Sequence, residues 1–198
     1  MCRHSSVYDE EYRGYTIRIE HDQDCSSPRE NDNLGTIATW HRRYALGDVQ
    51  PRETPEEYIA GLPKGTISLP VYMYEHGGIA LSTGRDGQFS DPWDSGQLGV
   101  ITCTPEKIRA EYSCKRITPA IREKVIAVLT GEIEEYSHFV GGECYGYVIE
   151  DIDGEHVDSC WGFIGYEYVQ EAAREQADYF ADERDKANAE QAEQLDQA

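Results

Sequence analysis

Long apolar runs are missing from this sequence. No stretch approaches the roughly 18 consecutive apolar residues that a membrane-spanning helix needs. The opening residues 1–6 are polar and are followed by an acidic run at Asp9, Glu10 and Glu11, so they contain no apolar signal-peptide centre. The sequence therefore argues against membrane spanning and export, and we expect a cytoplasmic protein.

Positive charge is also scarce. The chain has 18 Lys and Arg residues against 38 Asp and Glu residues, a formal net charge of −20. Residues 132–198 hold 19 acidic and 3 basic residues, net −16, whereas residues 1–131 hold 19 acidic and 15 basic residues, net −4. Such a field repels bare nucleic acid and anionic lipid and attracts basic surfaces at long range. We therefore expect no direct nucleic-acid binding and no membrane binding.

Sequence signatures of common catalytic and metal sites are absent as well. The six cysteines include no C-x-x-C pair, and a cytoplasmic chain keeps its thiols reduced. The sequence has no nucleophile elbow, phosphate-binding loop, H-E-x-x-H motif or dinucleotide fingerprint. Hydrophobic residues at 39% and aromatic residues at 11% exclude wholesale disorder. We expect a globular protein that is not an enzyme and holds no cofactor or metal.

Apolar and β-branched runs bounded by Gly, Pro and Asp predict most of the strands. A hairpin turn is expected at residues 153–154, Asp-Gly, and another tight turn at residues 76–78. An alternation over residues 15–19 predicts an edge strand in the polar N-terminal segment. The strands expected from residue 34 onward are 37–40, 66–74, 78–82, 98–103, 145–149 and 157–163.

Three Thr-Pro pairs predict helix starts, because Thr caps unpaired amides and Pro suits the first helical position. They lie at Thr54, Thr104 and Thr118. After Thr118, apolar residues recur at helical spacing as far as Tyr136, with Gly131 as a candidate interruption.

A last helix is expected from residue 166. Its apolar stripe ends at Phe180, so the residues beyond predict an exposed helix or a fraying tail. Strands and helices do not alternate regularly, which favours an α+β fold with a largely antiparallel sheet, two or three packed helices and a long acidic C-terminal helix. The expected division is a polar segment with a possible edge strand at 1–33, a single α+β domain at 34–165, and the acidic helix with its fraying tail at 166–198.

Two tryptophan motifs give the chain a family resemblance. They read D-P-W-D-S-G-Q-L-G at residues 91–99 and D-S-C-W-G-F at residues 158–163, and the segments 40–47 and 145–149 are similar too. Over roughly residues 34–168 the chain resembles an uncharacterised family of small proteins from phages, prophages and other mobile elements. The family supplies no catalytic residues. By analogy, its setting implies interference with host defence in the cytoplasm of the host cell.

Three local patterns allow more than one interpretation. Residues 150–155, E-D-I-D-G-E, fit a solvated hairpin turn better than a calcium loop, because Ile149 stands where an EF-hand needs an acid. The Asp and Ser residues around Trp93 fit either a two-carboxylate site for acid-base or metal chemistry, or an Asx-type turn with Trp93 in the core. His41 with the two arginines after it fits an anion site or salt bridges within this acidic chain.

The acidic third of the chain is the main functional candidate. A duplex carries one phosphate charge per roughly 1.7 Å of its axis, so 16 net charges correspond to roughly 27 Å of DNA. We expect a phage or mobile-element antidefence protein, of the anti-CRISPR or antirestriction type, that blocks a basic nucleic-acid-binding surface of a host defence complex by acidic DNA mimicry. The partner is then a basic host protein or ribonucleoprotein complex. The expected partner-binding residues are Glu132, Glu134, Glu135, Glu150, Asp151, Asp153, Glu155, Glu167, Glu171, Glu175 and Asp178.

Two alternatives stay open. One is a non-catalytic interaction module for a partner within the phage, in which the charge only keeps the protein soluble. The other is a small metal-dependent hydrolase that uses Asp91, Asp94 and a Cys or His.

Overall fold

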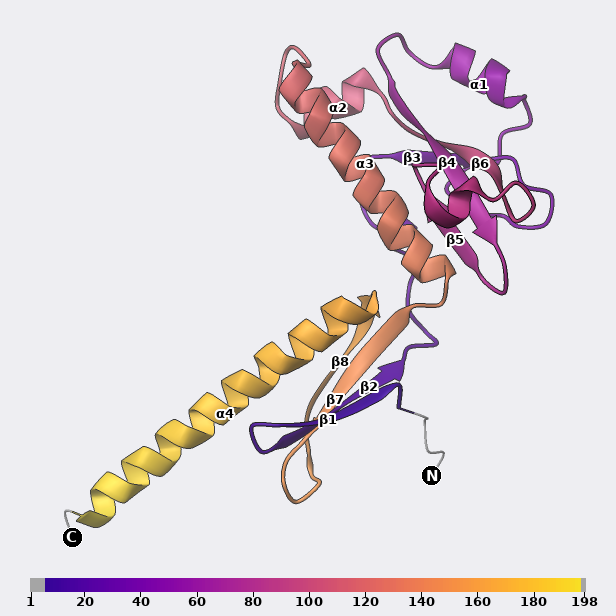
Figure 1. Ribbon diagram of the computed structural model, residues 1–198. Helices are drawn as coiled ribbons and strands as arrows, with labels where there is room; N and C mark the ends of the chain where they lie inside the picture. The colour runs from indigo at the N-terminus through magenta and orange to yellow at the C-terminus, as the bar shows by residue number, and fades with distance from the viewer. Residues whose placement is uncertain (1–5, 197–198) are drawn as a thin grey trace. The chain divides into compact units, whose positions relative to one another are not determined.

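The computed structural model describes residues 6–196, with side chains as far as residue 195. Within these residues it has four α-helices and two four-stranded antiparallel sheets, which confirms the α+β class and the long C-terminal helix (Figure 1). The chain forms two compact units. Ser27–Gly142 is called the inserted unit, because in the sequence it interrupts the other. Met1–Ser26 and Glu143–Ala198 together are called the split unit.

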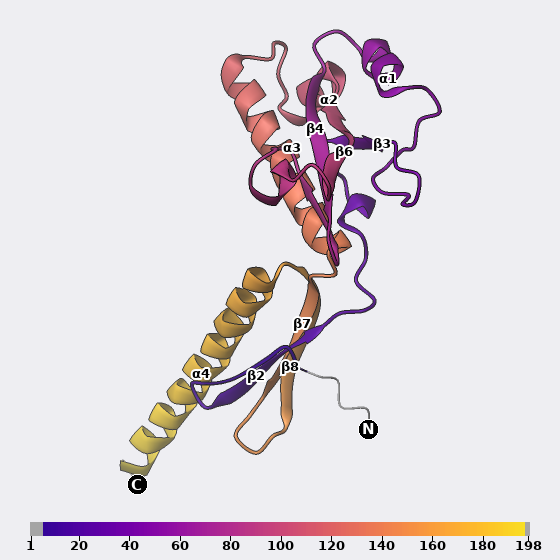
Figure 2. The same cartoon turned by 45° about the vertical axis from the view of Figure 1, so that its right-hand side comes forward.

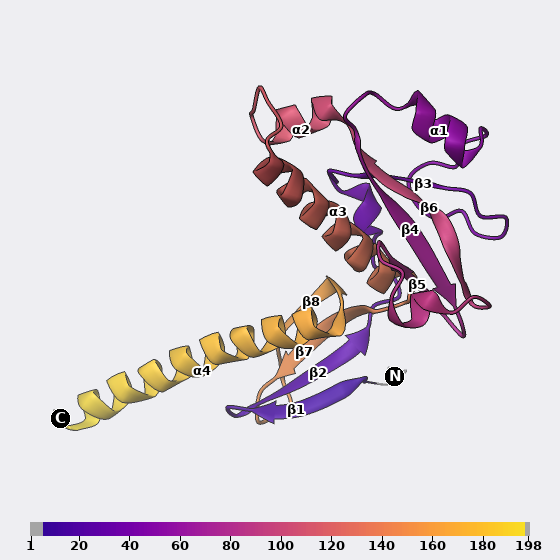
Figure 3. The same ribbon diagram turned by 45° about the horizontal axis from the view of Figure 1, so that its top comes forward.

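In the inserted unit a sheet packs against one long helix. The strand order is β3-β6-β4-β5, and α3 lies along one face of the sheet (Figure 3). Val125, Leu129 and Ile133 of α3 are fully buried there. The elements are β3 (Thr36–Thr39), α1 (Pro55–Gly61), β4 (Ile67–Glu75), β5 (Ile79–Ser82), β6 (Ser95–Cys103), α2 (Pro105–Glu111) and α3 (Pro119–Val140), with 3-10 turns at Pro28–Glu30 and Gly87–Ser90.

The helix starts follow the Thr-Pro pairs, as predicted. The hydroxyl groups of Thr54, Thr104 and Thr118 each accept a hydrogen bond from the backbone N–H three residues later. The expected interruption at Gly131 is wrong, because α3 runs through it. A single helical glycine costs about 1 kcal/mol relative to alanine, and the buried apolar residues on either side of it outweigh that cost.

The split unit has the strand order β1-β2-β7-β8. The strand expected at residues 15–19 is confirmed as β2, but its expected edge position is wrong, because β2 pairs with β1 on one side and with β7 on the other. The hairpin turn at residues 153–154 is confirmed, with Gly154 at a φ of 79°. The elements are β1 (Tyr8–Tyr12), β2 (Tyr15–His21), β7 (Cys144–Glu150), β8 (His156–Ile164) and α4 (Tyr166–Asp196).

Helix α4 covers one face of this sheet (Figure 2). Its buried side consists mainly of small residues. Val169, Ala173, Ala177 and Ala181 are all fully buried. The four-residue spacing keeps them on one side of the helix, and alanine lets the helix approach the strands closely. Beyond Ala181 every described side chain, residues 182–195, is exposed, which is about 21 Å of helix at 1.5 Å per residue.

The two units cut across the division expected from the sequence. The expected single domain at 34–165 contains β7 and β8, but these strands pair with β2 and with each other rather than with the sheet of the inserted unit. The N-terminal segment and α4, expected to be separate parts, belong to one unit with them. Strand pairing between distant segments decides this organisation, and local patterns carry no information about it.

Candidate protein-binding surface

The two units differ sharply in charge. The split unit has 22 acidic and 6 basic residues, net −16, and the inserted unit has 16 acidic and 12 basic residues, net −4. The acidic residues near the start of the chain and those near its end therefore belong to the same unit. The split unit therefore carries the stronger negative charge of the two.

Two tyrosines and two glutamates form a row on the outward side of α4. Tyr168 and Tyr179 are 66% and 58% exposed, and three helical turns, about 16 Å, separate them. Glu171 and Glu175 are exposed and lie between them at helical spacing, so all four share one side. Exposed aromatic anchors beside charged residues are typical of protein-binding surfaces. We call these four residues the outer row.

Other acids of α4 have partners inside the split unit. Asp178 accepts a hydrogen bond from the Arg13 guanidinium at 2.8 Å and one from the Tyr12 hydroxyl at 3.2 Å. The same guanidinium contacts Asp182 at 2.8 Å. The hydrogen bond from Arg13 lowers the pKa of Asp178. Asp178, which the sequence assigned to partner binding, therefore ties α4 to the β1–β2 turn, whereas Glu167 is exposed.

The acids of the β7–β8 hairpin divide in the same way. Glu150 forms an ion pair with Arg18 of β2. One carboxylate oxygen of Asp151 accepts the backbone N–H groups of Asp153 and Glu155, both at 2.9 Å, and so closes the turn. The side chains of Asp153 and Glu155 are exposed. The solvated-turn interpretation of this segment fits the structure, and these two carboxylates are the ones presented outward.

The side chain of Glu132 is largely buried and has partners within the inserted unit, which argues against its predicted role in partner binding. Its carboxylate accepts the backbone N–H of Leu34 at 2.6 Å and that of Gly35 at 3.1 Å, and it pairs with Arg29 at 2.9 Å. The side chains of Arg29 and Glu132 are only 7% and 10% exposed. Burial alone would lower the pKa of Arg29, but hydrogen bonds to Asp48 and Glu132 raise it. Glu132 thus anchors the first segment of the inserted unit to α3.

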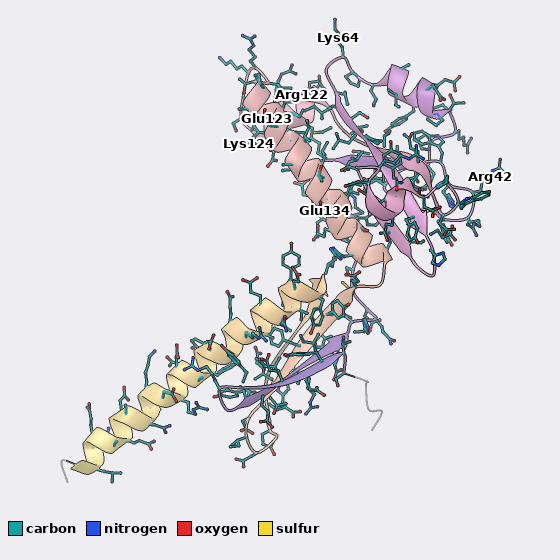
Figure 4. All side chains as sticks on the ribbon, in the orientation of Figure 1. Arg42, Lys64, Arg122, Glu123, Lys124 and Glu134 are labelled. Atoms are coloured by element: carbon teal, nitrogen blue, oxygen red, sulfur yellow. The ribbon has the colours of Figure 1, made fainter. Side chains whose placement is uncertain are left out.

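Glu134 and Glu135 are exposed on α3, where Figure 4 labels Glu134. Like Glu132, they belong to the inserted unit, whereas the other eight predicted partner-binding residues belong to the split unit. Glu134 and Glu135 therefore do not belong to the same compact unit as the acidic surface of α4.

The segment around Trp93 forms the Asx-type turn, but Trp93 does not fill the core. Asp91 accepts the backbone N–H of Trp93 at 2.7 Å and that of Asp94 at 3.2 Å, and the Trp93 side chain is 92% exposed. Asp94 contacts His76 at 2.9 Å, and the hydroxyl of Ser95 donates to backbone carbonyls. The polar groups singled out by the sequence hold this loop together beside a cavity of about 440 Å³.

His41 also has a local role. Its Nδ1 accepts the backbone N–H groups of Arg43 and Tyr44, while Arg43 pairs with Glu75. The salt-bridge interpretation of this segment, rather than an anion site, agrees with these contacts.

Sequence reasoning missed the tyrosines of the outer row. The signal was present, because an interval of eleven residues brings two positions to the same side of a helix. Tyr168 and Tyr179 fall outside the apolar stripe that ends at Phe180, so their positions relative to that stripe would have marked them as outward.

Comparison with protein-family models, with curated proteins and with solved structures gives no match for the chain. No helix within residues 6–196 combines the length and the apolar character needed to cross a membrane. In the same part of the chain, no group of three or more His, Cys, Asp and Glu side chains could hold a metal ion.

Proposed function

We propose that this is a non-enzymatic phage or mobile-element protein that binds a basic, nucleic-acid-binding surface of a host defence complex, such as a CRISPR effector or a restriction enzyme, and blocks it by occupancy. The observation that carries the proposal is the concentration of net charge −16 on the split unit, together with the outer row of α4. The family resemblance of the tryptophan motifs supplies the phage setting.

The charge density supports DNA mimicry by the whole split unit rather than by α4 alone. The 31 residues of α4 span about 46 Å and carry 10 acidic and 3 basic residues. Net −7 over that length is one charge per roughly 6.6 Å, against one per 3.4 Å for a single DNA strand. Spread over the same length, the net −16 of the split unit gives one charge per roughly 2.9 Å. The mimicking surface must therefore include acids of the sheet and the hairpin.

The tyrosines supply what charge alone does not. Screened surface charges accelerate association but add little affinity. Buried aromatic anchors supply most of the binding energy in many interfaces. In this proposal the acids steer the split unit to a basic surface, and Tyr168 and Tyr179 then become buried against it.

A pull-down from host lysate at low and high salt tests the proposal. We expect recovery of a basic nucleic-acid enzyme that is released at about 0.5 M salt and that short duplex DNA displaces. Recovery of a virion protein that ignores salt would contradict the proposal and favour the module that acts within the phage.

Matched charge variants locate the surface. Glu171→Gln with Glu175→Gln removes two charges from the outer row, and Glu134→Gln with Glu135→Gln removes two exposed charges from the inserted unit. We expect the first pair to slow association with the recovered enzyme about fivefold or more at low salt, and the second pair to have a much smaller effect. Equal effects of both pairs would contradict a site on α4.

A further inference from the structure

A cavity of about 580 Å³ lies at the end of β2 in the split unit, where Glu20 and Trp161 belong to the face of the sheet that α4 leaves uncovered. The residues around it are Glu20, His21, Asp22, Gln23, Asp24 and Trp161. We propose that this cavity receives an arginine side chain of the basic partner. This inference rests on the proposed function, because it adds a specific contact to the electrostatic one.

Strand register places an aromatic wall and a carboxylate in one row. Glu20 of β2 pairs with Gly146 of β7, and Gly146 pairs with Trp161 of β8. Side chains at paired positions lie on the same face of a sheet. A Cβ at residue 146 would lie 2.2 Å from Cε3 and 2.4 Å from Cδ2 of Trp161. The indole therefore occupies the space above the glycine and packs on the strand, while Trp161 stays 45% exposed.

Two further carboxylates belong to the turn that follows β2. One oxygen of Asp22 accepts the backbone N–H of Asp24 at 2.9 Å, and the other accepts that of Gly162, next to Trp161, at 3.0 Å. The carboxylate is thus fixed between the turn and β8. The lining includes three acidic side chains and neither Lys nor Arg. His21 stacks on Tyr145, with ring centroids 4.9 Å apart.

This chemistry fits a guanidinium group. An arginine side chain is planar, stacks on indole by a cation–π interaction and donates two parallel hydrogen bonds to a carboxylate. Lysine offers only a point charge without the stacking plane. A metal ion is not the expected occupant, because within residues 6–196 no group of three His, Cys, Asp or Glu side chains could hold one.

His21 lies at the end of the face that α4 covers, where it stacks on Tyr145, but the Glu20 and Trp161 side of the cavity and α4 lie on opposite faces of the sheet. A flat partner would touch only one of them. A partner that touches both must enclose the split unit, as a positively charged channel encloses a nucleic acid.

Fluorine NMR of the full chain labelled with 5-fluorotryptophan tests the cavity directly. The three resonances, from Trp40, Trp93 and Trp161, are assigned with single Phe variants. The probe is N-acetylarginine amide, and N-acetylcitrulline amide is its uncharged control of the same shape. We expect arginine amide to shift the Trp161 resonance in a saturable way and citrulline amide to leave it unmoved. Equal shifts with both probes, or equal shifts at all three tryptophans, would overturn the proposal.

Two variants with the same change in charge separate a specific contact from a general field. Glu20→Gln should weaken the arginine response about fivefold or more, whereas Glu171→Gln on α4 should leave it unchanged. Equal losses would overturn the specific site. If the lysate experiment yields a salt-sensitive enzyme but arginine amide does not bind, only the cavity is refuted. If arginine amide binds but no basic partner is recovered, the proposed function fails and the cavity stands.

Discussion

Replacing Glu132 by alanine should destabilise the inserted unit severely. The change leaves the Arg29 guanidinium, 7% exposed, without one of its two carboxylates, and removes the acceptor of the Leu34 and Gly35 N–H groups. Removing one partner of a buried ion pair costs about 3–5 kcal/mol. A domain of this size is stable by about 5–15 kcal/mol. At about 2 kcal/mol per molar urea, we expect the unfolding midpoint to fall by about 1.5–2.5 M.

The assay follows urea unfolding by tryptophan fluorescence in a Trp161→Phe background. Trp40 and Trp93, which remain, both lie in the inserted unit and report on it alone. Glu135→Ala is the matched control, because Glu135 is exposed on the same helix, and it should change the free energy of unfolding by less than about 0.5 kcal/mol. If Glu132→Ala behaves like this control, the buried network does not stabilise the unit and the structural role of Glu132 is refuted.

Three more outcomes follow from the split unit. Deleting residues 187–198 removes no described buried side chain, so calorimetry should show a melting temperature within about 2 °C of the full chain, and a larger fall would contradict the exposure of this segment. Burial raises the pKa of the Cys144 thiol to about 12, while Cys160 is exposed; brief alkylation at pH 8, read by peptide mass spectrometry, should modify Cys160 and spare Cys144. Hydrogen bonding to Arg13 lowers the pKa of Asp178, so its stabilisation is complete above its unfolded pKa of about 3.9 and disappears as the pH falls through the lower folded value. Asp178→Asn should therefore lower the urea midpoint at pH 7 and lose its effect near pH 2, and an equal effect at both would contradict the pairing.

Local signals predicted most individual elements. The Thr caps at residues 54, 104 and 118, the Asp-Gly turn and the start of the last helix near Tyr166 each depend on a few neighbouring residues, and each agrees with the structure. Capping and turn preferences depend on three or four neighbouring residues, so they can be predicted from the sequence alone.

Long-range partners could not be predicted in the same way. Glu132 lies at helical spacing from the buried residues Val125 and Leu129, but a carboxylate at that position predicts exposure. Its burial depends on Arg29, 103 positions earlier in the chain, and on the backbone N–H groups of Leu34 and Gly35. The acidic strand β1 contains little apolar pattern, because Tyr8 and Tyr12 flank three consecutive carboxylates, one of which, Glu10, pairs with Arg174 of α4. Pairing between distant segments of one chain produces no pattern in the sequence near either partner.

The insertion of one unit into the other fixes the order in which the chain can fold on the ribosome. Strand β2 ends at His21 and its partner β7 begins at Cys144. At about 5–20 residues per second, β7 leaves the ribosome roughly 6–25 s after β2. All strands of the inserted unit are synthesised in that interval, so the inserted unit can complete its sheet first. During this time β1 and β2 can pair with each other, but the edge of β2 that later binds β7 has no partner. The negative charge of the two strands opposes association with other chains during that time, as charged residues do on exposed strand edges.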